Sequence, residues 1–273
     1  MTTFTYGMEF EVEGITPNRA SDALNNGGID CERVDSDIHA DGFDSWKAVY
    51  DGSLNNGAEV VSPILTDARL NEAHKVANLL AGAGARVGRS TGFHIHIGAD
   101  AFNRVERVES ATDAMARFVL NYYGVHHAIA ALVAPSRLRN RYCQILGETE
   151  AKQEAEWVAN GNLSSRFNSR YYSLNLESLQ RHGTLEIRLH QGTLNGVKAI
   201  AWAQFVASLI TATKRGADLT QIEGITPWAP VYRGGGEKSP SDCRTLLDYL
   251  VASGDLKPSA GDWLKHRADK LNG

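Results

Sequence analysis

Alternating apolar and polar residues mark six segments of the chain as β-strands. Between Tyr6 and Glu13, aromatic and aliphatic residues alternate with glutamates, the pattern of a strand with one apolar and one acidic face. Further strands are predicted at residues 46–50, 58–62, 93–97, 171–178 and 184–190. Short turn-rich stretches at 51–57 and 180–183 join neighbouring strands in pairs. These pairs predict an antiparallel sheet.

Apolar residues spaced three and four apart predict helices between and after these strands. The expected helices are residues 67–80, 107–134, 148–160, 195–214, 242–252 and 260–271. We therefore expect an α+β fold in which helices pack on the apolar face of the sheet and the polar face lines an active-site cleft. Residues 1–216 are expected to form the catalytic domain. Residues 217–273, a Gly/Pro-rich loop and two short helices, are expected to pack on the same domain.

Composition and charge narrow the class of protein. Of the 273 residues, 42% are hydrophobic and 22% are charged, and the net charge is −4, which is typical of a globular chain and gives no basic excess for nucleic acid. No window holds the roughly 20 uninterrupted apolar residues of a membrane span. Because Glu9, Glu11 and Glu13 interrupt the first apolar run, we expect no secretory signal. The three cysteines form no C-x-x-C pair. We expect a cytoplasmic protein with no membrane partner, and binding to nucleic acid would require a local basic patch.

The polar faces of the strands gather residues that can hold a cation. They carry Glu9, Glu11, Glu59, His94, His96, Asn175, Glu186 and Arg188. Each segment alone has a simpler explanation: a solvated edge strand, hydrogen-bonded strand histidines, or a surface pair of Glu186 with Arg188. Together, the polar faces of these strands supply many acidic residues and only one arginine to pair with them. Converging carboxylates repel one another unless cations lie among them, and oxygen-rich sites suit Mg²⁺ or Mn²⁺.

Five motifs resemble, in order, those of the amidoligase family. They are Tyr-Gly-Met-Glu-Phe-Glu-Val-Glu (6–13), Asp-Gly-Ser-Leu with Ala-Glu-Val-Val-Ser-Pro (51–54, 58–63), Thr-Gly-Phe-His-Ile-His-Ile-Gly (91–98), Arg-Tyr-Tyr-Ser-Leu-Asn-Leu (170–176) and Gly-Thr-Leu-Glu-Ile-Arg-Leu-His (183–190). That family comprises ATP-dependent carboxylate–amine ligases related to gamma-glutamylcysteine synthetase and glutamine synthetase. The resemblance implies a glutamine-synthetase-like catalytic fold whose polar sheet face binds ATP with Mg²⁺ or Mn²⁺.

The resemblance also implies a reaction and residue roles. A carboxylate attacks the γ-phosphate of ATP, and an amine converts the resulting acyl phosphate into an amide or isopeptide bond. The acid and the amine would be small molecules or peptides. The implied metal ligands are Glu9, Glu11, Glu59, His94 and Glu186. Glu186 and Arg188 would be catalytic, with Arg188 on the transferring phosphate, and the implied cofactor contacts are Arg188, Arg139, Arg141, Asn175 and Arg170.

Several alternatives stay open at this point. The basic segment with Arg137, Arg139 and Arg141 binds ATP phosphates or the substrate carboxylate, or is a solvated loop. Arg170 and Asn175, which lie in a family motif, could instead line the substrate side of the cleft. The spacing of His94 and His96 is also found in metal-dependent hydrolases of the amidohydrolase type, although those have a regular β/α alternation that this sequence lacks. A non-catalytic binding protein is the third reading, and it predicts no nucleotide turnover.

Overall fold

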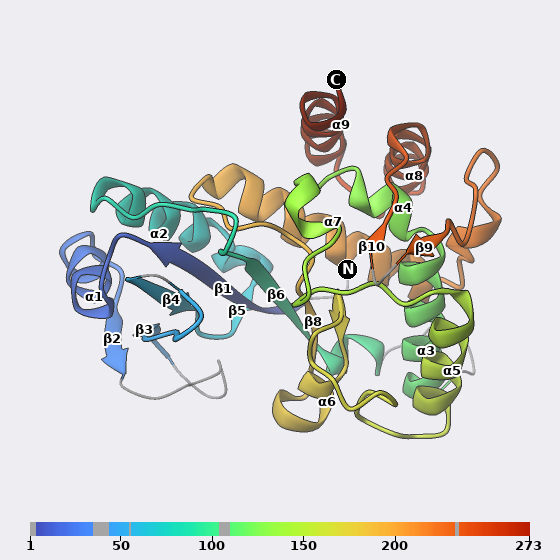
Figure 1. The fold of residues 1–273 in the computed structure, drawn as a ribbon, viewed down its shortest axis with the longest axis horizontal. Helices are drawn as coiled ribbons and strands as arrows, with labels where there is room; N and C mark the ends of the chain where they lie inside the picture. Colours follow the sequence, from blue (N-terminus) through green and yellow to red (C-terminus); the bar gives the residue numbers. More distant parts are fainter. Residues whose placement is uncertain (1–3, 35–43, 55, 104–109, 233–234) are drawn as a thin grey trace. The chain divides into compact units, whose positions relative to one another are not determined.

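The computed structural model describes residues 4–34, 44–54, 56–103, 110–232 and 235–273. Its contacts divide the chain into two compact units, residues 3–98 with 190–203 and residues 99–189 with 204–273. Both units contain helices and strands, and nearly all strand pairs are antiparallel (Figure 1). The expected α+β class with a mostly antiparallel sheet is therefore confirmed. The boundary at residue 216, which was placed from motifs, stays a prediction.

The sheet of the first unit is built around its longest strand. Its strands are β1 (Thr5–Glu13), β2 (Cys31–Val34), β3 (Trp46–Val49), β4 (Gly57–Val61), β5 (Leu65–Thr66) and β6 (Phe93–Gly98). β1 pairs antiparallel with β4 on one side and with β6 on the other, and β5 pairs with its first residues. β3 extends the sheet beyond β4, and β2 joins β3 in parallel. β1 is thus hydrogen-bonded along both edges.

One face of this sheet is an apolar core. Met8, Phe10 and Val12 of β1 are at most 1% exposed, and the Phe10 ring lies 6.2 Å from Trp46 and 4.7 Å from Phe93. Two helices, α1 (Pro17–Asn26) and α2 (Asn71–Gly82), add buried alanine, valine and leucine side chains, and α1 contacts β2, β3 and β4 (Figure 1). Apolar residues of β1 thereby face the core, which leaves its glutamates on the opposite face.

Helix α1 and strands β2 and β5 of the first unit are absent from the sequence-based prediction. α1 begins after Thr16, whose hydroxyl accepts a hydrogen bond from the Arg19 amide, and it has Pro17 in its first turn. Both are ordinary signals of a helix start, but only three buried residues follow them. β2 has a mainly exposed burial pattern and four residues, so its hydrophobic signal is weak.

The second unit is mainly helical. Its elements are α3 (Ala111–Gly124), α4 (His126–Ala130), α5 (Glu148–Ala159), β7 (Leu174–Asn175), α6 (Glu177–His182), β8 (Thr184–Ile187), β9 (Val231–Tyr232), β10 (Gly235–Gly236), α8 (Pro240–Ala252) and α9 (Pro258–Asn272). α3 packs along α5, α8 contacts both α9 and α4, and β7 pairs antiparallel with β8 (Figure 1). The helix expected over residues 107–134 is two helices, and its first three residues lie outside the described part of the chain.

The prediction of a strand over residues 171–178 is wrong for all but the two residues of β7. Only β7 is extended, and α6 follows it directly. The Asn175 Oδ1 atom accepts a hydrogen bond from the Glu177 amide (2.9 Å), and the Ser178 hydroxyl donates to the carbonyl oxygen of Asn175 (2.9 Å). Such local bonds from short polar side chains favour a helix start over a strand. The turn expected at 180–183 is the end of α6, where Gly183 has φ +64°.

Helix α7 (Gly196–Lys214) is the most apolar helix among the described residues. By length and composition it could cross a membrane, yet 72% of the residues in its apolar window are buried in the fold. Its first residues belong to the first unit and the others to the second. A helix that is apolar on all sides is also what the interior of a folded protein requires. Burial therefore accounts for its composition, and cytoplasmic location stays a prediction.

Candidate active site

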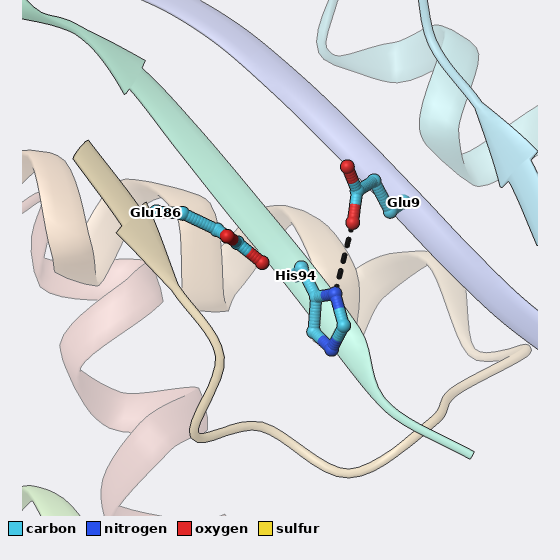
Figure 2. Close-up of side chains that lie close together, drawn as sticks. All are labelled: Glu9, His94 and Glu186. Carbon is cyan, nitrogen blue, oxygen red and sulfur yellow. Dashed lines mark hydrogen bonds and ion pairs between the residues drawn. The ribbon is translucent and has the colours of Figure 1, made fainter. Parts of the chain in front are cut away.

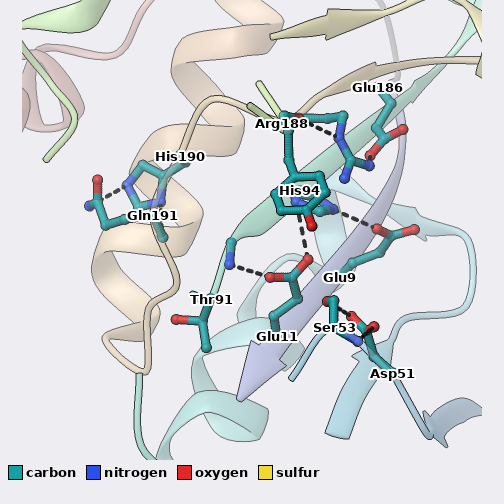
Figure 3. Close-up of polar contacts among 12 residues, drawn as sticks. Glu9, Glu11, Asp51, Ser53, Thr91, His94, Glu186, Arg188, His190 and Gln191 are labelled. Atoms are coloured by element: carbon teal, nitrogen blue, oxygen red, sulfur yellow. Dashed lines mark hydrogen bonds and ion pairs between the residues drawn. The ribbon is translucent and has the colours of Figure 1, made fainter. Parts of the chain in front are cut away.

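The register of β1 with its neighbours places acidic and imidazole side chains on one face of the sheet. Glu11 lies opposite Glu59 of β4, and Glu9 lies opposite His94 of β6. Figure 3 shows Glu9, Glu11 and His94 close together. His96, two residues along β6, shares that face because side chains alternate along a strand. We call Glu9, Glu11, Glu59, His94 and His96 the acidic cluster. Four of its five members are at most 8% exposed.

Glu9 holds both histidines of the cluster. Its Oε2 lies 2.9 Å from His94 Nδ1 (Figure 2), and its Oε1 lies 3.0 Å from His96 Nε2. A carboxylate on one ring nitrogen fixes the orientation and tautomer of a histidine, as is common where the second nitrogen binds a metal. The contact with Glu9 therefore leaves His94 Nε2 directed at the other carboxylates of the cluster.

Glu11, Glu59 and His94 form a group that fits a divalent cation. Each offers one ligand atom, and these atoms lie within 4.8 Å of one another. His94 Nε2 is 3.4 Å from Glu11 Oε1. Two carboxylates and one imidazole suit Mg²⁺ or Mn²⁺, with the imidazole favouring Mn²⁺. His96 is bound to Glu9 and does not belong to this group, which argues against a hydrolase site built on both histidines.

Gly92 is a site residue that the sequence gives only as a member of the motif at residues 91–98. Its amide donates a hydrogen bond to the Glu11 carboxylate. A Cβ atom at this position would lie 2.6 Å from His94 Nε2 and 3.3 Å from Glu11 Oε2. No side chain fits there without displacing the histidine. The available signal is the position of the glycine in the motif, two residues before His94.

Lys47 is a second residue that the sequence analysis does not single out. It lies on β3 opposite Val61, which is itself opposite Glu9, so Lys47 is on the same face as the acidic cluster. Its side chain is buried, and its ammonium group lies 2.8 Å from Glu32 and 3.0 Å from the Ser45 hydroxyl. The sheet face that carries the acidic cluster therefore also carries a buried lysine, which the sequence-based set of site residues does not include.

In the second unit, Glu186 is surrounded by donors. β7 and β8 place Asn175 opposite Glu186, and Asn175 Nδ2 donates to Glu186 Oε2 at 2.5 Å. Arg188 Nη1 donates to Glu186 Oε1 (Figure 3). Asn175 and Glu186 are buried, at 3% and 4% exposure. The pair of Glu186 and Arg188 is thus a largely buried ion pair and not a surface one. We call Asn175, Glu186 and Arg188 the guanidinium cluster.

The remaining predicted arginines differ in exposure. Arg139, Arg141 and Arg170 are exposed, and the guanidinium groups of Arg141 and Arg170 lie over the rings of Tyr142 and Tyr171. Arg137 is buried and donates to the backbone oxygens of Leu189 (3.2 Å) and Arg188 (2.8 Å). Arg137 is therefore neither a solvated loop residue nor an open ligand contact. The binding roles of the exposed three stay predictions.

Comparison with known proteins gives one family. The family model described as "Putative amidoligase enzyme" matches residues 2–210. A search of curated proteins finds no match. Among solved structures, the bifunctional glutathione synthetase from Pasteurella multocida is similar at 10% identity with a TM-score of 0.46, covering 99% of this chain and 47% of that enzyme, so the chain spans about half the enzyme's length. The match over residues 2–210 shows that this chain belongs to the amidoligase family.

Proposed function

We propose that this protein is an ATP-dependent carboxylate–amine ligase that forms an amide or isopeptide bond through an acyl phosphate. The observation that carries the proposal is the group of Glu11, Glu59 and His94, whose ligand atoms lie within 4.8 Å of one another on a sheet of an amidoligase-family chain. A glutamine-synthetase-like catalytic fold and a cytoplasmic location are part of this proposal. Small-molecule or peptide acids and amines are its substrates.

The acidic cluster would hold the cation. ATP with Mg²⁺ or Mn²⁺ would supply the phosphoryl group and neutralise its charge. Glu11 and Glu59 offer carboxylate oxygens and His94 offers Nε2, while Glu9 holds His94 Nδ1 at 2.9 Å and so fixes the ring. Gly92 leaves room for this arrangement and donates its amide to Glu11. Glu9 as a further ligand follows from the family motif.

The guanidinium cluster would serve the phosphate side of the reaction. From the motifs alone, Glu186 is proposed as a further ligand and catalytic group, and Arg188 as the contact of the transferring phosphate. Arg139 and Asn175 are proposed as cofactor contacts on the same ground, whereas the choice between ATP and the acid substrate stays open for Arg141 and Arg170. Within the second unit, Asn175 and Arg188 both donate hydrogen bonds to the Glu186 carboxylate, which hold it in place. Phosphoryl transfer depends mostly on such positioning of charge.

The test is a search for amide formation. The protein is incubated with ATP, Mg²⁺ or Mn²⁺ and pooled amino acids and amines, and the products are examined for ADP and for a condensation product that has lost one water. The variant Glu59→Gln should lose ADP formation. Glu13→Gln is the matched control, because Glu13 lies on the same face of β1 but accepts a hydrogen bond from Ser90 (2.5 Å) outside the ligand group.

The result that overturns the proposal is equally definite. If no pairing of acid and amine leads to ADP formation, the protein is not the proposed ligase. The same holds if Glu59→Gln forms ADP as fast as Glu13→Gln. Metal binding is read separately from the melting temperature. A divalent cation bound to the folded state raises it, and Glu59→Gln should reduce that rise whether or not a substrate has been found.

A further inference from the structure

Three exposed arginines lie in the second unit. Arg139, Arg141 and Arg170 are exposed, and within the described part of the chain no carboxylate forms an ion pair with any of them. The chain as a whole has a net charge of −4. A local excess of positive charge on such a chain attracts an anion from solution.

Two of these arginines are organised by aromatic rings. The Arg141 guanidinium carbon lies 4.6 Å from the Tyr142 ring centre, and that of Arg170 lies 5.6 Å from the Tyr171 ring centre. The two rings meet edge to face at 5.3 Å. We call these four residues the arginine–tyrosine ladder. Stacking holds each guanidinium in one orientation, which lowers the entropic cost of binding a planar anion.

The arginine–tyrosine ladder is joined to the strand that carries the guanidinium cluster. The Gln144 amide donates to the Tyr171 carbonyl (2.8 Å), and the Ser173 amide donates to the Gln144 carbonyl (2.7 Å). The Arg188 amide donates to the Ser173 carbonyl (2.9 Å), and Arg188 Nε donates to the Tyr142 carbonyl (3.2 Å). Three neighbouring backbone segments therefore connect the ladder to Arg188.

We propose that the arginine–tyrosine ladder binds a carboxylate of the acid substrate other than the one that reacts. This inference rests on the proposed function, and it assigns the acid substrate to compounds with at least two carboxylates. Guanidinium forks bind carboxylates through paired hydrogen bonds. A carboxylate held in this way has lost much of its negative charge to its partners, so it is a poor nucleophile toward phosphorus. The ladder thus suits an anchoring carboxylate and not the attacking one.

The probes are glutarate and pentanoate, which have the same chain length and differ by one carboxylate. Binding is measured by calorimetry or ligand-observed NMR at low ionic strength, because exposed charges are screened by salt. Glutarate should bind about tenfold or more tightly than pentanoate, the effect of one added charge-assisted contact. Binding of ATP with Mg²⁺ is measured separately, because phosphate oxygens share the chemistry that the ladder recognises.

The variants are Arg141→Gln and Arg170→Gln, with Arg181→Gln as the control. Arg181 is an exposed arginine of α6 in the same unit and lies outside the ladder. The two ladder variants should weaken glutarate binding about tenfold and leave pentanoate and ATP binding within about twofold. The control should change nothing. Arg170→Lys, which keeps the charge and loses the fork, should be intermediate, and melting temperatures establish that each variant is folded.

Two results overturn the inference. If the wild type binds glutarate no better than pentanoate, the ladder is a solvated surface. If the ladder variants weaken ATP binding and leave glutarate binding unchanged, the anion is a nucleotide phosphate. These measurements need no turnover. If the ladder binds glutarate but the protein forms no ADP, only the ligase proposal fails. If the protein is a ligase that uses monocarboxylic acids equally well, only the ladder proposal fails.

Discussion

The acidic cluster and the guanidinium cluster both contain buried glutamates, yet they are built in different ways. In the acidic cluster the strand register determines which residues meet, and it sets Glu11 directly opposite Glu59. In the guanidinium cluster, hydrogen bonds from Asn175 and Arg188 reach both carboxylate oxygens of Glu186. Like charges opposite one another destabilise a strand pair, whereas a buried carboxylate with charge-assisted bonds is stabilised.

The glutamates of the two clusters therefore differ in whether a positive partner within the chain already offsets their charge. The ligand group of the first cluster brings two carboxylates together with one imidazole, so a bound cation would relieve repulsion. Glu186 already has a positive partner. The same substitution, glutamate to glutamine, should therefore affect the metal-free fold in opposite directions in the two clusters.

The largest effect is expected for Glu11→Gln. Loss of a ligand charge should lower metal-dependent ATP turnover about a hundredfold or more, equivalent to about 2.7 kcal/mol of transition-state stabilisation. The metal-free protein should melt at the same or a higher temperature, because Glu59 loses its opposing charge. Glu13→Gln is again the control. A less stable metal-free protein with unchanged metal dependence would contradict the assignment.

The matching change in the other cluster is Glu186→Gln. Here the metal-free fold should lose about 1.5–3 kcal/mol, because a buried hydrogen bond between charged groups is weakened. Unfolding by urea measures this loss. A double-mutant cycle with Arg188→Gln should show a coupling of about 0.5–3 kcal/mol. If Glu186→Gln left the metal-free fold as stable as wild type, the distinction between the two clusters would fail.

Gly92→Ala tests whether space beside His94 matters. The added methyl group would lie 2.6 Å from His94 Nε2, so the ring must move away from Glu11 and Glu59. Metal affinity, read from the metal-induced rise in melting temperature, should fall about tenfold or more, or about 1.4 kcal/mol. Gly88→Ala is a suitable control, because its Cβ would lie 3.2 Å from Glu13 Oε2 and away from the ligand group. Equal metal responses of the two variants would exclude the steric argument.

The comparison extends to the buried histidines of the two units. His94 and His96 each contact Glu9. His126 instead contacts the rings of Tyr122 and Tyr123. Its Nε2 has no hydrogen-bond partner among the described residues. Burial, followed by the nearby His127, lowers the pKa of His126 to about 3. The neighbouring Asp242 is 2.6 Å from His127 Nε2, and its pKa is lowered by hydrogen bonds from Thr226, Ser239 and His127, which outweigh its burial.

A depressed histidine pKa gives stability that is present above the unfolded-state value and is lost as the pH falls. Below about pH 6.5 the unfolded chain binds a proton that folded His126 does not, so the free energy of unfolding decreases by about 1.4 kcal/mol per pH unit. His126→Phe keeps a ring and removes the proton. Between pH 7.5 and 5.5 the wild type should lose about 1.4 kcal/mol more than this variant. Equal losses would show that His126 is protonated in the fold. The Asp242 contribution is lost only at lower pH.

How well the sequence predicts each cluster depends on what builds it. Alternation along Tyr6–Glu13 and residues 93–97 places Glu9, Glu11 and His94 on polar faces, and strand pairing brings those faces together. The register that sets Glu11 opposite Glu59 cannot be predicted from either strand alone, because it depends on how the two strands pair. The role of Gly92 as empty space likewise appears only in three dimensions.

The region around β7 shows the opposite case. Residues 171–178 alternate like a strand, yet hydrogen bonds from Asn175 and Ser178 end the strand and begin α6. Alternation reports which residues fit a half-buried strand, whereas these bonds depend on single polar atoms. Arg137 is a similar case, because its charge resembles that of Arg139 in the sequence and only the fold shows that its guanidinium group is used by backbone carbonyls.

Asn175 links the start of a helix to the orientation of the Glu186 carboxylate. Its side-chain oxygen accepts the amide hydrogen of Glu177 at the start of α6, so its amino group is the end that faces Glu186. An amide held in this direction donates a hydrogen bond to Glu186 Oε2 and cannot accept one from it. Formation of a six-residue helix thus determines which hydrogen-bonding group Glu186 meets before any substrate arrives.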